Sequence, residues 1–221
     1  MKLLFEALFK FIFGLVLVGA MLFLSAGSLL YMNGWLFIGV LFVPMLALGV
    51  VLFIKSPSLL RKRLDAKEKG KTQKGVVAFS GILFAAGFII SGFDFRFGWS
   101  SVPTWCVIAA SVVFLVSYVL YAEVMRENVY LSRTIEVSSE QKVVSEGLYG
   151  IIRHPMYAVT VWLFLSIPII LGSLFALVCF VPYVFIIAVR IVDEEKLLTA
   201  ELDGYEKYKK NVKYRLIPLV W

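Results

Sequence analysis

Six stretches of the chain contain no Asp, Glu, Lys or Arg, and they constrain the fold more than any other feature. These apolar runs cover residues 11–31, 35–54, 75–93, 102–122, 156–171 and 173–189. About 20 apolar residues in a helix are needed to cross a bilayer of about 30 Å. Only 17% of all residues are charged, against about a quarter in soluble domains. The sequence therefore predicts an all-α integral membrane protein with about six transmembrane helices.

The last two apolar runs are predicted to form a helical hairpin, because only Gly172 and Ser173 break them. Both arms, from Pro155 to the break and from the break to Arg190, measure about 26 Å at about 1.5 Å per residue. Antiparallel arms of equal length bring residues 153–154 back beside residues 190–195. Side chains some 40 positions apart along the chain, by the same helical geometry, are therefore expected to touch.

The distribution of basic residues predicts that both termini are cytoplasmic. This topology places every Lys and Arg on the cytoplasmic side except Arg96, as the positive-inside rule requires. The net charge of +7 is thus a topology signal, and no nucleic-acid partner is expected. The basic segment 55–74 is also expected to contact anionic lipid. No cleavable signal peptide is predicted, since the first apolar run is too long for one.

Several functions are excluded by what the apolar runs lack. Ion pathways and proton relays need charged groups inside the membrane, and transporters often show internal repeats; the sequence has neither. Cys106 and Cys179 lie in different runs, far from the single histidine, His154, so no metal-ligand set is predicted. There is no P-loop or GxGxxG motif. Any chemistry is expected at the cytoplasmic helix ends and loops.

The stretch "GLYGIIRHPMYAV", residues 147–159, places an arginine and a histidine at the start of the predicted hairpin. Proline is favoured in the first turn of a helix, so a helix should begin at Pro155. Its N-terminus carries partial positive charge, to which Arg153 adds a planar cation suited to carboxylates. This arrangement needs an anion, and Glu194, Glu195 or a ligand carboxylate qualifies. Taken singly, these elements are also typical of an interfacial anchor, a solvated helix end and an aromatic belt.

Three segments in order resemble the isoprenylcysteine carboxyl methyltransferase superfamily of integral membrane enzymes, which includes phospholipid N-methyltransferases and many bacterial relatives. They are "QKVVSEGLYGIIRHPMY" (141–157), "RIVDEEKLL" (190–198) and "YEKYKKNVKYRLIP" (205–218). The earlier stretches "SPSLLRKRL" and "GFDFRFGWSSVP" also resemble bacterial members. The resemblance departs from the family's usual residues at Gln141 (often His), Leu148 (often Pro) and Val159 (often Gly).

The resemblance implies an S-adenosylmethionine-dependent methyltransferase with a cytoplasmic cofactor pocket and a lipidic or hydrophobic acceptor. It implies cofactor contacts from Gln141, Val144, Gly147, Tyr149, His154, Tyr157, Glu194 and Glu195, and catalytic roles for Arg153, Arg190 and Glu195. No metal is expected. Residues 1–101 would hold the N-terminal helices and the basic loop, and residues 102–221 the methyltransferase core. The expected location is the cytoplasmic membrane of a bacterium or archaeon.

Two other functions remain open. Sterol reductases share a similar C-terminal hairpin that binds a nicotinamide cofactor, although this chain looks short for their full set of spans. A non-catalytic membrane protein could also retain the hairpin while its pocket is lost, as Val159 indicates. The sequence leaves the identity of the acceptor and the oligomeric state undetermined.

Overall fold

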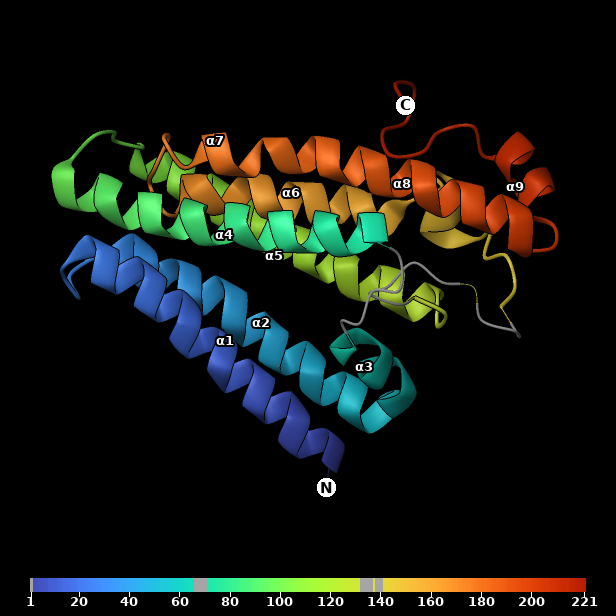
Figure 1. Ribbon diagram of the computed structural model, residues 1–221, viewed down its shortest axis with the longest axis horizontal. Coiled ribbons are helices and arrows are strands. Elements are labelled where there is room, and N and C mark those ends of the chain that lie inside the picture. The colour runs from blue at the N-terminus through green and yellow to red at the C-terminus, as the bar shows by residue number, and fades with distance from the viewer. Residues whose placement is uncertain (1, 66–70, 132–136, 138–140) are drawn as a thin grey trace.

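The computed structural model describes residues 2–65, 71–131, 137 and 141–221, and this part of the chain is helical with no strand (Figure 1). The elements are α1 (Lys2–Ala26), α2 (Met32–Lys55), α3 (Pro57–Leu64), α4 (Lys71–Phe97), α5 (Thr104–Glu127), the 3₁₀ turn η1 (Gly147–Gly150), α6 (Pro155–Ile170), α7 (Leu177–Phe180), α8 (Pro182–Glu201) and α9 (Tyr205–Asn211). The predicted all-α class is confirmed. Of the basic segment 55–74, residues 66–70 lie outside the described residues.

Four of the described helices are long and apolar enough to cross a membrane. They are Lys2–Ala26, Met32–Lys55, Gln73–Phe97 and Thr104–Glu127. Helix α6 is apolar but shorter, and α8 carries Asp193, Glu194 and Glu195 in its second half. The chain is therefore an integral membrane protein by the length and composition of its helices, with four spans supported directly and the hairpin α6–α8 beside them.

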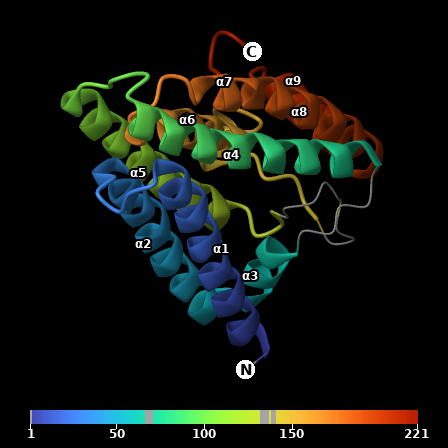
Figure 2. The same cartoon turned by 60° about the vertical axis from the view of Figure 1, so that its left-hand side comes forward.

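The long helices form a bundle with two distinct ends: they meet at one end, and α1 and α2 diverge from α4, α6 and α8 toward the other (Figures 1 and 2). The connections 27–31, 98–103 and 171–176 lie together at one end. The end of α5, the start of α6, the end of α8 and α9 lie at the other. The chain crosses the bundle along each long helix, so segments distant in sequence meet at these two ends.

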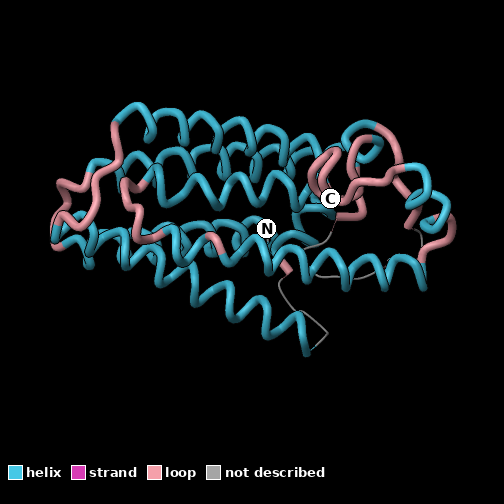
Figure 3. The backbone as a smooth tube through the Cα atoms, turned by 90° about the horizontal axis from the view of Figure 1, so that it is seen from above, coloured by secondary structure: helices cyan, strands magenta, loops and turns pink. Residues whose placement is uncertain are grey.

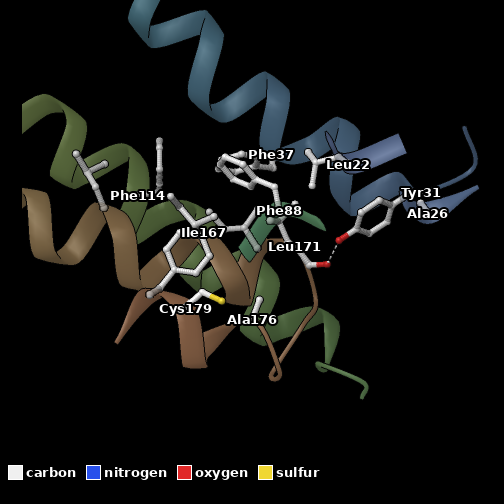
Figure 4. Close-up of a cluster of buried hydrophobic side chains, with 13 residues drawn as sticks. Leu22, Ala26, Tyr31, Phe37, Phe88, Phe114, Ile167, Leu171, Ala176 and Cys179 are labelled. Atoms are coloured by element: carbon white, nitrogen blue, oxygen red, sulfur yellow. Dashed lines mark hydrogen bonds between the residues drawn. The ribbon is translucent and has the colours of Figure 1, made fainter. Parts of the chain in front are cut away.

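One hydrophobic cluster joins the N-terminal helices to the hairpin (Figure 4). Phe37 of α2 packs on Phe88 of α4 and Phe114 of α5, with ring centroids 5.6 and 6.3 Å apart. Tyr31 is 1% exposed, and its hydroxyl donates to the carbonyl of Leu171 at the hairpin turn, at 2.5 Å. The cluster contains residues from both 1–101 and 102–221, so the two parts share a core.

A buried carboxylate fixes the connections at the same end of the bundle. Asp94 of α4 is 1% exposed. Its Oδ1 accepts the Ser100 backbone N–H at 2.7 Å, and its Oδ2 accepts the hydroxyls of Ser100 at 2.6 Å and Ser173 at 2.5 Å. Burying a polar group costs free energy unless it is hydrogen-bonded, and these contacts satisfy Asp94. Asp94 therefore ties the α4–α5 connection to the turn of the hairpin.

The hairpin is present, but its second arm differs from the prediction. Helix α6 begins at Pro155, as predicted, and the chain reverses at Gly172, whose φ of 75° favours glycine. Figure 3 shows the described chain as helices joined by loops, with the loops gathered near the two ends of the molecule. The apolar run 173–189 is not one helix: bends and turns precede the short α7, and α8 begins at Pro182. Proline has no N–H to continue the helical ladder, which explains the interruption. Helix α8 then extends beyond the apolar run to Glu201.

Candidate functional site

The start of α6 is held by the C-terminal tail. His154 is the N-cap residue, with φ of −126° and ψ of 60°, and Pro155 occupies the first turn. The backbone N–H groups of Arg153 and His154 donate to the carbonyls of Tyr214 and Arg215, both at 2.9 Å. These two amides are therefore satisfied by the tail, and the anion predicted at this helix start has to be found among the side chains.

That anion is Glu195 of α8, which is 5% exposed. Its Oε1 accepts Arg153 Nε at 2.7 Å and lies 3.2 Å from His154 Nε2, and its Oε2 accepts Arg215 Nε at 2.9 Å. Arg153 Nη1 also donates to the carbonyls of Val212 and Lys213, at 2.8 and 2.9 Å. The contact predicted across the hairpin is thus present. We call Arg153, His154, Glu195 and Arg215 the Glu195 cluster.

The surroundings of Glu195 favour its charged form. Burial raises the pKa of this carboxyl, but hydrogen bonds from His154, Arg215 and Arg153 outweigh burial and lower the pKa from 4.5 to about 2. A charge that is buried away from water must be compensated by such partners. Removing one member of the group leaves the others buried without a full set of partners. The Glu195 cluster therefore joins α6, α8 and the tail through a carboxylate that is ionised at neutral pH.

A second polar group lies beside this cluster and faces a cavity. The hydroxyl of Tyr157 on α6 donates to Glu194 Oε2 at 2.6 Å and is also hydrogen-bonded to Arg190, which is 8% exposed. All three side chains line the cavity. Consecutive residues of α8 thus serve different purposes: Glu195 is directed into the protein, while Glu194 is available to a ligand.

The loop before α6 is anchored by α5. Both carboxylate oxygens of Glu127 lie within 3.2 Å of the Leu148 backbone N–H. Gly147 has φ of 58°, and a Cβ added there would lie 2.0 Å from Glu127 Oε1, so only glycine fits. Tyr149 receives a hydrogen bond on its hydroxyl from Asn128, at 3.1 Å, and one on its carbonyl from Tyr208, at 2.7 Å. These contacts place Tyr149 at the cavity wall.

The cavity has a volume of about 700 Å³ and extends from the loops into the helical bundle. Its walls differ along its length. Toward the loops it is lined by polar and aromatic side chains, among them Asn128, Gln141, Tyr149, Arg190, Glu194, Tyr205 and Tyr208. Toward the bundle it is lined mainly by apolar and aromatic residues, among them Leu41, Met45, Val77, Phe84, Phe114, Leu163 and Ile167. It suits a ligand pair of which one is polar and one apolar.

Eight of the ten site residues predicted from sequence line this cavity: Gln141, Val144, Tyr149, Arg153, His154, Tyr157, Arg190 and Glu194. The other two do not line it. Gly147 forms the turn against Glu127, and Glu195 is surrounded by Arg153, His154 and Arg215. Val159 is 6% exposed and is also absent from the cavity wall, so a side chain here does not narrow the cavity.

Five residues of this region were missed by the sequence analysis: Glu127, Asn128, Tyr205, Tyr208 and Arg215. Arg215 lies in the basic ending "KYRLIP" that formed part of the resemblance. The motif therefore included this residue, but no role was assigned to it. Glu127 and Asn128 end α5, and nothing in their spacing links them to residues 147–149. Within the described part of the chain, no three His, Cys, Asp or Glu side chains are grouped as a metal site would require.

Part of the chain matches a known protein family. Residues 105–200 match the model of the Isoprenylcysteine carboxyl methyltransferase (ICMT) family. The matched segment contains α5, the loop that precedes α6, and the hairpin almost to the end of α8. No curated protein matches the chain. The match confirms the family resemblance noted from the sequence, and α9 and the tail lie outside it.

Replacement of Glu195 by glutamine should destabilise the protein, because it leaves Arg153 and Arg215 without a counter-charge. We expect a loss of about 3–5 kcal/mol in the free energy of unfolding, measured in detergent micelles. Glu123→Gln is the matched control, since Glu123 forms an exposed ion pair with Arg126 and should leave stability near that of the parent.

The same experiment has a pH dependence with a defined sign. The pKa of Glu195 is lowered from 4.5 to about 2, so its contribution is fully present above pH 4.5 and is lost as the pH falls toward 2. The stability difference between parent and Glu195→Gln should therefore shrink over that interval. A difference that stays constant there, or a Glu195→Gln protein as stable as Glu123→Gln, would contradict the role of the cluster.

Proposed function

We propose, from the match of residues 105–200 to the isoprenylcysteine carboxyl methyltransferase family, that the protein transfers a methyl group from S-adenosylmethionine to a lipidic or membrane-partitioned acceptor. The observation that carries the proposal is the cavity of about 700 Å³ with a polar part and an apolar part. A polar cofactor and an apolar acceptor would meet where these parts join.

The side chains of the polar part fit this cofactor. S-adenosylmethionine supplies a methyl group that is already activated by a positively charged sulfonium. A cation is favoured by carboxylates and by aromatic faces, each face contributing about 0.5–2 kcal/mol. Glu194 supplies a carboxylate, and Tyr149 and Tyr157 supply aromatic rings at the cavity wall. Gln141 and His154 add polar groups there, and the backbone at Val144 completes the contacts proposed from the resemblance.

Two cations are proposed to face the methyl acceptor. Arg190 and Arg153 both line the cavity and are both 8% exposed. Arg153 is fixed by Glu195 and by two carbonyls of the tail, so its position is set before any ligand binds. Methyl transfer needs the acceptor aligned with the methyl group and water excluded. Glu195 contributes to catalysis by orienting Arg153 and His154.

The acceptor is proposed to occupy the apolar part of the cavity. The residues there come from α2, α4, α5 and α6, the helices that lie within the membrane. Gly81 of α4 lines the cavity and is itself exposed, so a hydrophobic molecule could enter from the bilayer beside it. A prenylated thiol's carboxylate, a phospholipid amine, a small thiol and a phenol all suit this arrangement.

Cofactor binding tests the proposal against both other candidate functions. Detergent-purified protein should bind S-adenosylmethionine in a calorimetric titration and should not bind NADPH. Glu194→Gln should weaken S-adenosylmethionine by about 1.5–3 kcal/mol, the value of one charge-assisted contact. Binding of NADPH instead would identify a reductase, and binding of neither would identify a non-catalytic protein.

Blocking the apolar part should separate acceptor binding from cofactor binding. A side chain at Gly81 meets nothing within 4 Å of its Cβ, so Gly81→Trp should fold and fill that space. We expect the KM for the acceptor to rise about tenfold, equal to about 1.4 kcal/mol, while the Kd for S-adenosylmethionine stays unchanged.

The matched control for this variant is Gly49→Trp on α2, which also meets nothing within 4 Å and is not among the cavity residues. Assays would use N-acetyl-S-farnesylcysteine, phosphatidylethanolamine and a hydrophobic phenol as acceptors. Equal effects of the two tryptophan variants would place the acceptor elsewhere.

We also propose that both termini face the cytoplasm of a bacterium or archaeon, with the polar part of the cavity on that side. The basis is the charge distribution, in which Arg96 alone among Lys and Arg falls on the opposite side. Basic residues of α3 would then lie near anionic lipid headgroups. Reporter fusions at residues 1 and 221 should both report a cytoplasmic location, and opposite locations would remove this topology.

A further inference from the structure

Tyr205, the first residue of α9, has a buried hydroxyl without a hydrogen-bond partner. The residue is 4% exposed and lines the cavity. Among the described residues, one other buried side-chain atom shares this property, Gln73 Oε1, and Gln73 does not line the cavity. Buried polar groups in folded proteins are nearly always hydrogen-bonded, and an exception calls for an explanation.

The neighbouring tyrosine shows what the hydroxyl of Tyr205 lacks. Tyr208 lies one turn later on α9 and also lines the cavity, but its hydroxyl donates to the Tyr149 carbonyl at 2.7 Å. The rings of Tyr205 and Tyr208 pack together, with centroids 5.7 Å apart, in a cluster with Leu198 and Leu202. Packing accounts for the ring of Tyr205, since phenylalanine would serve equally, but it does not account for the hydroxyl.

The environment of Tyr205 keeps this hydroxyl protonated. Burial, and then the nearby carboxylates of Glu195 and Glu194, raise the pKa of the Tyr205 hydroxyl well above its ordinary value. The group is therefore an O–H donor on a residue that lines the cavity together with Gln141 and Tyr208. It needs an acceptor atom, and the described part of the protein provides none.

We propose that the Tyr205 hydroxyl is a binding donor for the cofactor, contacting an oxygen or nitrogen acceptor atom away from the sulfonium. The inference rests on the proposed function and extends it to α9, which lies beyond the matched residues 105–200. The acceptor atoms of the adenosyl and amino-acid parts are also present in S-adenosylhomocysteine, which lacks the methyl group and its positive charge. A contact of this kind should therefore contribute equally to the binding of S-adenosylmethionine and of S-adenosylhomocysteine.

The test is Tyr205→Phe, titrated with S-adenosylmethionine and with S-adenosylhomocysteine. We expect the Kd for both ligands to rise about tenfold, because the variant loses the hydrogen bond between the Tyr205 hydroxyl and the ligand. The melting temperature without ligand should stay the same or rise, because the variant removes an unsatisfied buried group. Glu194→Gln should instead weaken S-adenosylmethionine more than S-adenosylhomocysteine, since it removes a charge near the sulfonium.

Tyr208→Phe is the matched control for stability. Its hydroxyl is already bonded to Tyr149, so its loss should lower the melting temperature without ligand. Parent-like affinity of Tyr205→Phe for both ligands would overturn the assignment, and so would a melting temperature that falls together with affinity, as for a purely structural residue. If the parent binds neither ligand, the proposed function itself fails, and the assignment fails with it.

Discussion

The ion pairs of Glu195 are the interaction on which the rest of the site depends. One carboxylate receives Arg153 and His154 from the start of α6 and Arg215 from the tail, so three separate segments are fixed at one point. Glu195 and Arg153 are sheltered from water, where each needs the other as a counter-charge. Without Glu195, Arg153 would add an unpaired charge at the positive end of α6, and the tail would lose the ion pair between Arg215 and α8.

The opposite end of the bundle is fixed by a second buried carboxylate. Asp94 holds the hydroxyls of Ser100 and Ser173, and Tyr31 reaches the carbonyl of Leu171. The hairpin is thus held at its turn by polar contacts and at its open ends by ion pairs. The cavity lies between, where its volume depends on side chains from α2, α4, α5, α6 and α8. A pocket with both ends fixed is suited to alignment of two ligands.

The adjacent acidic residues Glu194 and Glu195 have different roles in the site. Glu194 and Glu195 look equivalent in the sequence "DEEK", but consecutive residues on a helix point about 100° apart. The outcome is that Glu194 faces the cavity with Tyr157, and Glu195 faces the tail. Arg153 combines both environments, since it lines the cavity and is held by Glu195. Roles that the sequence assigns to one pair of carboxylates are therefore separated by helical geometry.

The sequence alone determined the helical membrane class, the hairpin, the helix start at Pro155 and the approach of residues 153–154 to residues 190–195, because apolar run lengths, proline position and helical rise are local properties. It also identified eight residues of the cavity wall. Which carboxylate pairs with Arg153 was decided by the structure. The apolar run 173–189 was wrongly taken as one helix, since the prediction overlooked that Pro182 has no N–H to continue the helical ladder. The bends and turns after Gly172 are seen only in the structure. The anchoring of Gly147 by Glu127, the pairing of Arg215 with Glu195 and the buried hydroxyl of Tyr205 were decided only by the tertiary structure. Each joins segments far apart in sequence, and no spacing along the chain records which of them will meet.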